Sequence, residues 1–311
     1  MDYRIIEGDC IEGMRRLEGQ SVNCVVTSPP YFGLRDYGHD GQIGLEETPD
    51  AYVAKLVEVF REVRRVLRDD GTVWLNLGDS YANNGTGGNG ATGGRDKSTL
   101  QSAMPPIGTT PVKKSVPEGL KVKDLIGIPW RVAFALQADG WYLRQDIIWH
   151  KPNPMPESVR DRCTKAHEYV FLLSKSQSYH FDADAIKERA TSNANDKRRG
   201  DGGRYKDVQD TYGATHCGVS EDGKRNKRSV WTVATKPYKG AHFATFPPDL
   251  IRPCILAGCP KDGTVLDPFG GSGTTAQVAL EEGRKAVLCE LNTDYIALAH
   301  KRLEGLQLRI E

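Results

Sequence analysis

Residues 264–275 (TVLDPFGGSGTT) place a glycine-rich turn between an apolar run and a helical pattern. A turn of this kind lets a ligand approach the backbone and presents amide donors at the start of the following helix. Asp267 closes the apolar run, and Glu290 ends the next one, 23 residues later. An acid at that point can accept hydrogen bonds from both ribose hydroxyls of a bound nucleoside. The pattern therefore predicts a cofactor pocket at the edge of an open α/β sheet.

Other uses of such a turn fit the sequence less well. Gly271 and Gly273 match the start of the dinucleotide pattern G-x-G-x-x-G, but Ala276 stands where the third glycine belongs. No Gly-Lys-Ser/Thr follows, so a phosphate loop of the nucleotidase type is not indicated. A tight turn with structural glycines is the remaining alternative. Phe269 argues against it, because a bulky apolar residue within a turn normally packs against something.

Apolar runs alternate with helical patterns along the rest of the chain. Residues 22–27 (VNCVVT) are typical of a strand buried on both faces, residues 50–67 show helical spacing up to the stop at 69–71, and residues 72–77 form the next apolar run. Strand, helix and strand with short links predict parallel βαβ units, and so a doubly wound, mostly parallel, seven-stranded sheet in a single domain, 1–311. The other predicted strands are 3–7, 144–149, 168–173, 264–267 and 285–290, and the other helices are 11–17, 128–138, 248–257, 274–282 and 294–306.

Two stretches interrupt this pattern. Residues 84–94 are about half glycine and begin an insertion, 84–123, that we expect to be a flexible loop. Residues 189–228 hold ten Lys or Arg against six acids, interleaved with aromatic residues. We expect the second stretch to be a loop-rich basic insertion in the sheet fold.

The net charge, the length of the apolar runs and the cysteine pattern exclude several classes of protein. A formal charge of +1 over 311 residues gives no global field that would attract a polyanion, so any such surface must be local. Because no apolar run approaches 18 residues and the amino terminus lacks a signal core, we expect no membrane span. The seven cysteines show no CxxC pair and indicate reduced thiols of a cytosolic protein, with no metal site.

The segment Thr27-Ser28-Pro29-Pro30-Tyr31 directly follows the apolar run at 22–27. Two successive prolines remove two backbone donors and leave carbonyl oxygens facing outward. Ser28 adds a hydroxyl acceptor, and Tyr31 adds a flat face. This arrangement suits a planar ring with an exocyclic amine, whereas an ordinary Pro-Pro turn is the alternative if the segment is taken alone.

The two segments together resemble the amino-DNA methyltransferases that use S-adenosylmethionine. Because the catalytic motif precedes the cofactor motif, the circularly permuted order is similar to that of the β class. Three further segments resemble motifs of that family: Gly8-Asp9-Cys10 near the cofactor's adenine, 149–153 (WHKPN) near the target pocket, and 242–247 (HFATFP) over the methionine part of the cofactor.

The resemblance implies a role for each matching residue. Catalysis is assigned to Ser28, Pro29, Pro30 and Tyr31. The implied cofactor-binding residues are Asp9, Cys10, His242, Phe243, Asp267, Pro268, Phe269, Gly271, Ser272, Gly273, Thr274, Glu290 and Leu291. We expect Ser28 Oγ and the Pro29 carbonyl to accept the amine hydrogens of a base that has left the duplex, with Tyr31 stacked on its ring.

Double-stranded DNA is the implied partner. The family keeps its recognition region between the target strand and the cofactor-closing motif, which corresponds to 185–240 here; a solvated charged loop is the alternative. Arginines there would contact guanine edges and lysines phosphates. The glycine-rich loop 84–94 with Lys97, Lys113 and Lys114 is a second candidate for DNA contact, and a flexible surface loop without function is the equal alternative. The predicted DNA-binding residues are Lys151, Arg198, Arg199, Arg204, Arg225 and Arg228.

Several alternatives stay open. Ser28 favours cytosine-N4 as acceptor, because Asp at that position is the commoner adenine-N6 pattern of the family. An RNA or protein-glutamine acceptor typically goes with Asn-Pro-Pro-Tyr in the unpermuted order, and a noncatalytic DNA-binding regulator would be expected to lose Ser28, Tyr31 or the glycines. Carbon-5 methylation needs a Pro-Cys nucleophile, but Pro253-Cys254 lies in an apolar helical stretch. Asp79 is equally a pocket residue or a loop cap, and Glu168 is expected to be structural.

The resemblance also carries expectations about context. Members of the family act in the cytoplasm on the nucleoid, can have a restriction endonuclease counterpart, and are often homodimers.

Overall fold

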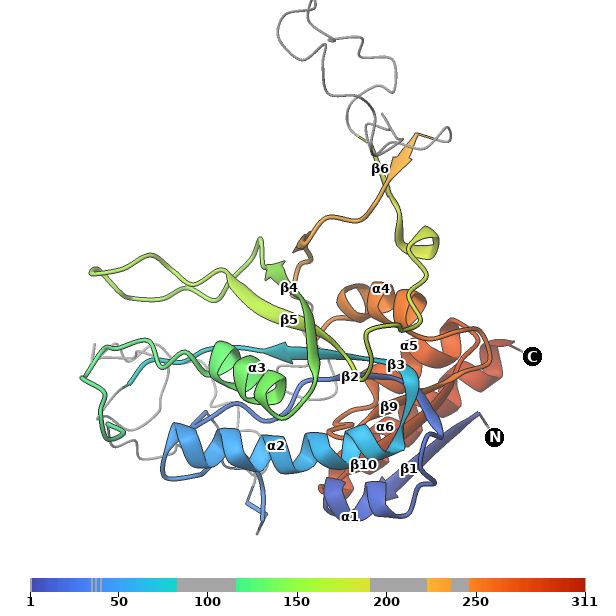
Figure 1. Ribbon diagram of the computed structural model, residues 1–311, viewed down its shortest axis with the longest axis horizontal. Coiled ribbons are helices and arrows are strands. Elements are labelled where there is room, and N and C mark those ends of the chain that lie inside the picture. The colour runs from blue at the N-terminus through green and yellow to red at the C-terminus, as the bar shows by residue number, and fades with distance from the viewer. Residues whose placement is uncertain are drawn as a thin grey trace, which may run out of the picture.

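The computed structural model describes residues 2–34, 36, 38–39, 41–82, 116–190, 223–235 and 246–310. Its centre is an eight-stranded sheet in the order β1-β10-β9-β2-β3-β5-β4-β8 (Figure 1). The first five strands of that order pair in parallel, β5 runs antiparallel to both neighbours, and β8 is parallel to β4. The strands are β1 (Tyr3–Glu7), β2 (Val22–Thr27), β3 (Leu67–Leu77), β4 (Tyr142–His150), β5 (His167–Ser174), β8 (Val230–Thr232), β9 (Thr264–Asp267) and β10 (Lys285–Glu290).

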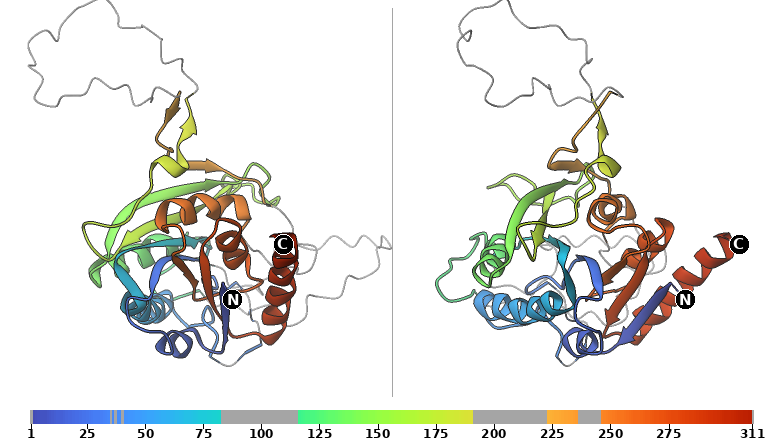
Figure 2. Two further views of the ribbon diagram at one scale, coloured as in Figure 1. Left: turned by 90° about the vertical axis from the view of Figure 1, so that its right-hand side faces the viewer. Right: turned by 45° about the vertical axis from the view of Figure 1, so that its right-hand side comes forward.

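Helices cover both faces of the sheet (Figure 2). One face carries α1 (Cys10–Arg15), α2 (Pro49–Val66) and α3 (Ile128–Ala138), and the other carries α4 (Pro248–Gly258), α5 (Thr274–Glu281) and α6 (Thr293–Ile310). Each face has its own apolar core, because alternate residues of a strand point to opposite sides. In β2, Val25 joins the core under α2, whereas Cys24 and Val26 join the core under α4 and α5.

The predicted doubly wound, mostly parallel sheet is confirmed, with two differences. The structure has eight strands in this sheet where seven were predicted; the addition is β8, a three-residue strand in the predicted recognition region. Strand β3 begins at Leu67, so residues 69–71 lie inside the strand and do not form the predicted stop after α2. Residues 68–70 are exposed there, and a register shift opposite them in β2 accommodates the longer strand.

Backbone hydrogen bonds join the two ends of the predicted insertion 84–123. Ala82 donates its N–H to the Asp124 carbonyl at 2.8 Å, and Lys123 donates to the Ala82 carbonyl at 2.8 Å. These bonds fix the departure and the return of the chain side by side. The part of the insertion up to residue 115 lies outside the described residues.

A short two-stranded ribbon projects from the body beyond β8 (Figures 1 and 2). It pairs β6 (Glu188–Arg189) with β7 (Lys224–Arg225), after a short helix, η1 (Asp184–Ile186). The ribbon belongs to the predicted recognition region. Among the described residues, no helix is both long and apolar enough to span a bilayer.

Candidate active site

The two motifs meet where β2 and β9 end side by side. The strands pair in parallel, so their carboxyl ends lie at the same edge of the sheet. Thr27 Oγ1, at the end of β2, donates a hydrogen bond of 2.7 Å to Asp267 Oδ1, at the end of β9. The predicted contact between segments 240 positions apart is therefore confirmed.

Asp267 holds the glycine-rich turn from within. Its Oδ1 also accepts from the Phe269 N–H at 3.0 Å, and its Oδ2 accepts from Thr275 Oγ1 at 2.6 Å. Burial raises the pKa of this carboxyl above its ordinary value, while the hydrogen bonds from Thr27, Thr275 and Phe269 act in the opposite direction. Each oxygen thus accepts at least one hydrogen bond from the protein, and the carboxylate fixes the loop to both strands.

The turn is anchored a second time by Glu290, at the end of β10. Gly271 adopts a φ of +49°, which favours glycine, and donates its N–H to Glu290 Oε2 at 2.7 Å. The N–H of Asn292 donates to Oε1 at 2.8 Å. Burial raises the pKa of Glu290, with a smaller contribution in the same direction from the charge of Asp267. The carboxylate is held in one orientation beside the loop.

Both motifs open into one cavity. Every described residue predicted for catalysis or cofactor binding lines it except Gly273, which has a φ of +80° and precedes α5. The lining residues that were predicted are Asp9, Cys10, Ser28, Pro29, Pro30, Tyr31, Asp267, Pro268, Phe269, Gly271, Ser272, Thr274, Glu290 and Leu291. His242 and Phe243 lie outside the described residues. Lining residues that the sequence reasoning missed are Leu34, His39, Gly41, Gln42, Ile43, Cys289, Asn292 and Tyr295.

One polar atom in this cavity has no partner in the described part of the chain. Ser272 Oγ is buried, with 4% of the residue exposed, and receives no hydrogen bond from these residues. A buried hydroxyl without a partner loses the free energy of its hydrogen bonds to water unless a ligand replaces them.

Asp9, another residue of the cavity wall, already has partners in the protein. Its Oδ1 accepts hydrogen bonds from the N–H groups of Ile11 and Glu12 and so caps α1.

The hydroxyl of Tyr31, another residue of the cavity wall, is the centre of a polar network. Tyr31 Oη donates to Glu168 Oε2 at 2.8 Å, lies 3.3 Å from Asn76 Oδ1, and is approached by Ser28 Oγ at 3.5 Å. Burial, followed by the charge of Glu168, raises the pKa of this phenol well above its ordinary value. The ring packs over Gly78, where an added Cβ would lie 2.5 Å from Tyr31 Cε2.

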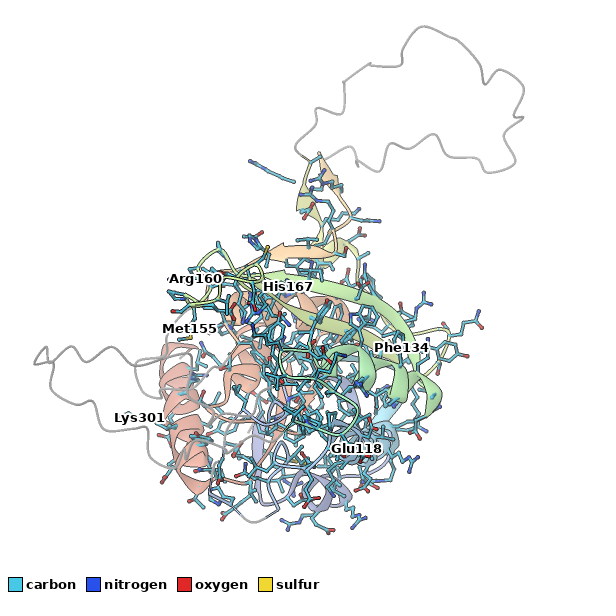
Figure 3. The ribbon with its side chains drawn as sticks, turned by 90° about the vertical axis from the view of Figure 1, so that its left-hand side faces the viewer. Glu118, Phe134, Met155, Arg160, His167 and Lys301 are labelled. Carbon is cyan, nitrogen blue, oxygen red and sulfur yellow. The ribbon has the colours of Figure 1, made fainter. Side chains whose placement is uncertain are left out.

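Lys151 and Glu168 form a largely buried ion pair beside Tyr31. Their side chains are 19% and 15% exposed, and the Lys151 ammonium also lies 4.3 Å from the centroid of the Trp149 ring. Glu168, expected to be structural, is therefore part of the candidate site. The β4–β5 connection that Lys151 begins carries exposed Arg160 and Met155, and His167 starts β5 (Figure 3).

Asp79 acts as a helix cap. Its Oδ1 accepts from the N–H groups of Gly127 and Ile128, at the start of α3, at 3.0 and 3.1 Å. Of the two roles that the sequence left open for it, the structure shows the capping contacts.

Cys254 lies inside α4, away from the cavity lining. Its residue is 1% exposed, its Sγ faces the Leu250 carbonyl at 3.7 Å, and burial raises the pKa of the thiol far above its ordinary value. A thiol in this state is not a nucleophile near neutral pH.

The predicted DNA-binding arginines are only partly described. Arg225 and Arg228 both form ion pairs with Glu188, at 3.0 and 2.6 Å, at the base of the β6–β7 ribbon. The Arg228 side chain keeps 66% of its surface exposed. Arg198, Arg199 and Arg204, with Lys97, Lys113 and Lys114, lie outside the described residues.

Comparison with known protein families identifies the family of this chain. A family model for DNA methylases of the N6/N4 type matches residues 22–301. The chain belongs to this DNA methylase family. The methyltransferase resemblance of the two motifs is thereby confirmed.

Relatives of this DNA methylase align over nearly the whole chain. The type II methyltransferase M.Cfr9I of Citrobacter freundii is 49% identical over 97% of this chain and 87% of its own length. M.SmaI of Serratia marcescens is 48% identical over 96% of this chain and 90% of its own length.

Solved structures share the fold at low sequence identity. PvuII DNA methyltransferase (cytosine-N4-specific) superposes with a TM-score of 0.64 at 19% identity, over 97% of this chain and 86% of that chain. TTHA0409 of Thermus thermophilus, a putative DNA modification methylase solved with S-adenosyl-L-methionine, superposes with a TM-score of 0.57 at 22% identity, over 96% of this chain and 94% of that chain.

Proposed function

We propose that this DNA methylase transfers the methyl group of S-adenosylmethionine to the N4 amine of a cytosine extruded from double-stranded DNA. The observation that carries the proposal is the single cavity shared by the Ser28–Tyr31 turn and the Asp267–Thr275 turn, held together by the bond from Thr27 to Asp267. S-adenosylmethionine supplies a methyl group already activated on a sulfonium. As the N–C bond forms and the S–C bond breaks, the sulfonium would become the neutral thioether of S-adenosylhomocysteine, and the methylated amine would release one proton.

The glycine-rich side of the cavity suits this cofactor. Ser272 Oγ offers a buried hydroxyl without a partner among the described residues, at a place where a polar ligand group would satisfy it. Glu290, fixed by two backbone N–H groups, can accept further hydrogen bonds from ribose hydroxyls through its remaining lone pairs. Asp9 and Cys10 line the same cavity and would border the adenine.

The proline turn suits the amine of a base. The nitrogen is a poor nucleophile because its lone pair is delocalised into the ring. Acceptance of its hydrogens by Ser28 Oγ and the Pro29 carbonyl would favour a pyramidal nitrogen, with its lone pair aimed at the methyl group. Catalysis by Ser28, Pro29, Pro30 and Tyr31 would then rest on alignment and on fixed dipoles.

Cytosine is favoured over adenine by Ser28. The family's adenine-N6 enzymes more commonly carry Asp at this position, and the neutral hydroxyl of Ser28 here stands beside the neutral phenol of Tyr31. Adenine-N6 is the alternative outcome of the test below.

The names of the relatives support a role in restriction and modification. M.Cfr9I and M.SmaI are type II methyltransferases, so we infer that this chain protects specific DNA sites from a counterpart endonuclease. The region 185–240 would supply sequence recognition. Within it, Arg228 keeps most of its side chain exposed for DNA, whereas Arg225 is 20% exposed.

The test is methylation of unmodified plasmid DNA by the purified protein with isotope-labelled S-adenosylmethionine. The DNA is digested to nucleosides and analysed by mass spectrometry. We expect labelled N4-methyldeoxycytidine; labelled N6-methyldeoxyadenosine would overturn the cytosine assignment, and no labelled nucleoside would overturn the proposed function.

Two variants assign the transfer to the site. Ser28→Ala should lower the single-turnover rate by about 100-fold or more, since it removes an acceptor used at the reacting amine, and leave cofactor affinity largely intact. Ser21→Ala is the matched control, because Ser21 is exposed and bonds only the nearby Glu18 carbonyl among the contacts recorded for it. Full activity of Ser28→Ala would contradict the assigned role.

A further inference from the structure

The nearest acceptor for the single proton of Tyr31 is Glu168 Oε2, at 2.8 Å, against 3.3 Å for Asn76 Oδ1. Tyr31 Oη donates to Glu168 Oε2 at 2.8 Å, and Ser28 Oγ lies 3.5 Å from the same phenol oxygen. A phenol has one proton and can also accept. When Tyr31 donates this proton in a hydrogen bond to Glu168, the phenol oxygen can act only as an acceptor toward Ser28 Oγ.

The direction of these bonds decides what Ser28 presents to the target. A serine hydroxyl has one proton and two lone pairs. If its proton points to Tyr31, the lone pairs remain for the hydrogens of the amine. If Tyr31 instead donated to Ser28, the serine proton would be free to face the amine hydrogens, and donor would oppose donor.

Glu168 is surrounded by donors that keep it an acceptor. The Lys151 ammonium contacts Oε1, and Asn76 Nδ2 lies 3.3 Å from Oε2. Asn76 is itself oriented, because its Nδ2 donates to the Tyr169 carbonyl at 3.0 Å. The position of Glu168 follows from the antiparallel pairing of β5 with β3 and β4, and its carboxylate reaches the hydroxyl of Tyr31, a residue of the cavity wall.

We propose that Glu168 is a positioning residue for methyl transfer. By accepting a hydrogen bond from Tyr31, it sets the direction of the hydrogen bond between Ser28 and Tyr31. The lone pairs of Ser28 Oγ then remain available to the hydrogens of the target amine. The inference rests on the proposed function. Lys151 is part of the same hydrogen-bond network, since its ammonium forms an ion pair with the second oxygen of Glu168 and balances the charge of the carboxylate.

Glu168→Gln tests the direction of the bonds with almost no change of shape. Because the Lys151 ammonium can only donate, the glutamine oxygen must turn to Lys151 and the amide N–H groups must face Tyr31. The hydrogen bond between Tyr31 and residue 168 is then reversed: the phenol oxygen accepts from the amide, and the phenol proton must turn away from residue 168. We expect the single-turnover rate at saturating DNA to fall by about 100-fold. The Kd values for S-adenosylmethionine and for DNA should stay within about twofold of wild type.

A second substitution should restore the original direction. In K151M/E168Q no ammonium competes for the glutamine oxygen, so it is free to turn to Tyr31 and accept its proton. We expect this double variant to transfer methyl about tenfold faster than E168Q alone, a coupling between neighbouring residues that simple loss of an ion pair would not give. Saturating DNA removes any effect of Lys151 on DNA affinity.

A further double variant tests whether Glu168 acts through Tyr31. If it does, Y31F/E168Q should be no slower than Y31F alone, because the phenol that Glu168 orients is already gone.

Glu62→Gln is the matched control, since Glu62 forms a 2.8 Å ion pair with Arg65 on α2 outside the cavity. It should transfer methyl at the wild-type rate. Thermal unfolding of each variant confirms that the compared proteins are folded.

The outcomes separate the two proposals. No methylation by the wild-type protein would overturn the proposed function itself. Methylation by wild type with an E168Q rate near wild type, or a K151M/E168Q rate no higher than that of E168Q, would overturn only the role of Glu168.

Discussion

Thr27 and Asp267 are joined by a hydrogen bond of 2.7 Å between side chains 240 residues apart, with both residues essentially buried. The bond links the last residue of β2 to the last residue of β9. It therefore ties the turn that would hold the base to the turn that would hold the cofactor. In-line transfer needs the reacting atoms about 3–3.5 Å apart, so the relative position of the two turns matters directly.

Thr27→Val should weaken both the fold and the site. Valine keeps the shape of threonine but leaves Asp267 Oδ1 with only the Phe269 N–H as a recorded donor. Loss of a hydrogen bond to a buried carboxylate should lower the free energy of unfolding by about 1.5–3 kcal/mol, measured by urea denaturation. S-adenosylmethionine should also bind less tightly. Thr232→Val, at an exposed position in β8, is the control; equal stability of the two variants would refute the argument.

Gly78→Ala should act on the Tyr31 ring alone. The new methyl group would lie 2.5 Å from Tyr31 Cε2, so the ring must move away from β3. Since a displacement of about 1 Å at a reacting centre can cost about 100-fold in rate, we expect a loss of kcat of that order with unchanged cofactor affinity. Gly305→Ala in α6, where an added Cβ meets no atom within 4 Å, should keep the wild-type kcat. An unchanged kcat in Gly78→Ala would mean that the ring has room to shift without effect.

Cys254→Ala separates amine methylation from a covalent carbon-5 route. The thiol is buried in α4, and burial raises its pKa far above the ordinary range. We expect the single-turnover rate to stay within about twofold of wild type, with a loss of stability of about 1 kcal/mol from the smaller side chain. Complete loss of transfer in a folded Cys254→Ala protein would instead support a cysteine nucleophile.

The meeting of the two motifs was predictable because it follows from sheet geometry. Apolar runs at 22–27 and 264–267 indicated buried parallel strands, and the carboxyl ends of such strands lie at one edge. The residues after those runs, Ser28 and Pro268, had to reach that edge. Patterns of apolar spacing carry this much information because buried strands and amphipathic helices require them.

The network around Glu168 was not predictable in the same way. Its place depends on β5 running antiparallel beside β3 and on the register that sets Trp149 opposite Glu168. Hydrophobic spacing gives neither strand direction nor register. Asn76 did carry a signal, since an amide inside the apolar run Leu75-Asn76-Leu77 must find partners when buried.

The cavity residues between 34 and 43 gave no periodic signal. This segment contributes Leu34, His39, Gln42 and Ile43 to the wall but lies between β2 and α2 without regular structure among its described residues. Loop residues of this kind are placed by tertiary contacts, such as the 2.7 Å bond from the Gly33 N–H to the Gly44 carbonyl.

Cofactor affinity should depend on pH through Glu290. Burial raises the pKa of this carboxyl in the free protein, and ribose hydroxyls would form stronger hydrogen bonds with its charged form, in which both oxygens only accept. Binding therefore favours the deprotonated state, so affinity is greatest above the raised pKa and weakens as the pH falls through it. That loss should begin at a higher pH than for an ordinary glutamate. Isothermal titration calorimetry with S-adenosylmethionine from pH 8 to about pH 5 measures it, on the expectation that a shifted carboxyl titrates above its usual range.

Glu290→Gln supplies the comparison for that titration. The amide keeps one acceptor oxygen but has no proton to gain in this range, so its affinity should be lower than that of wild type near pH 8 and nearly constant as the pH falls. Its second group, an NH₂, would face a backbone N–H of Gly271 or Asn292, which explains the lower starting affinity. A variant that keeps the wild-type pH dependence would show that another group, with Asp267 the nearest candidate, controls the titration.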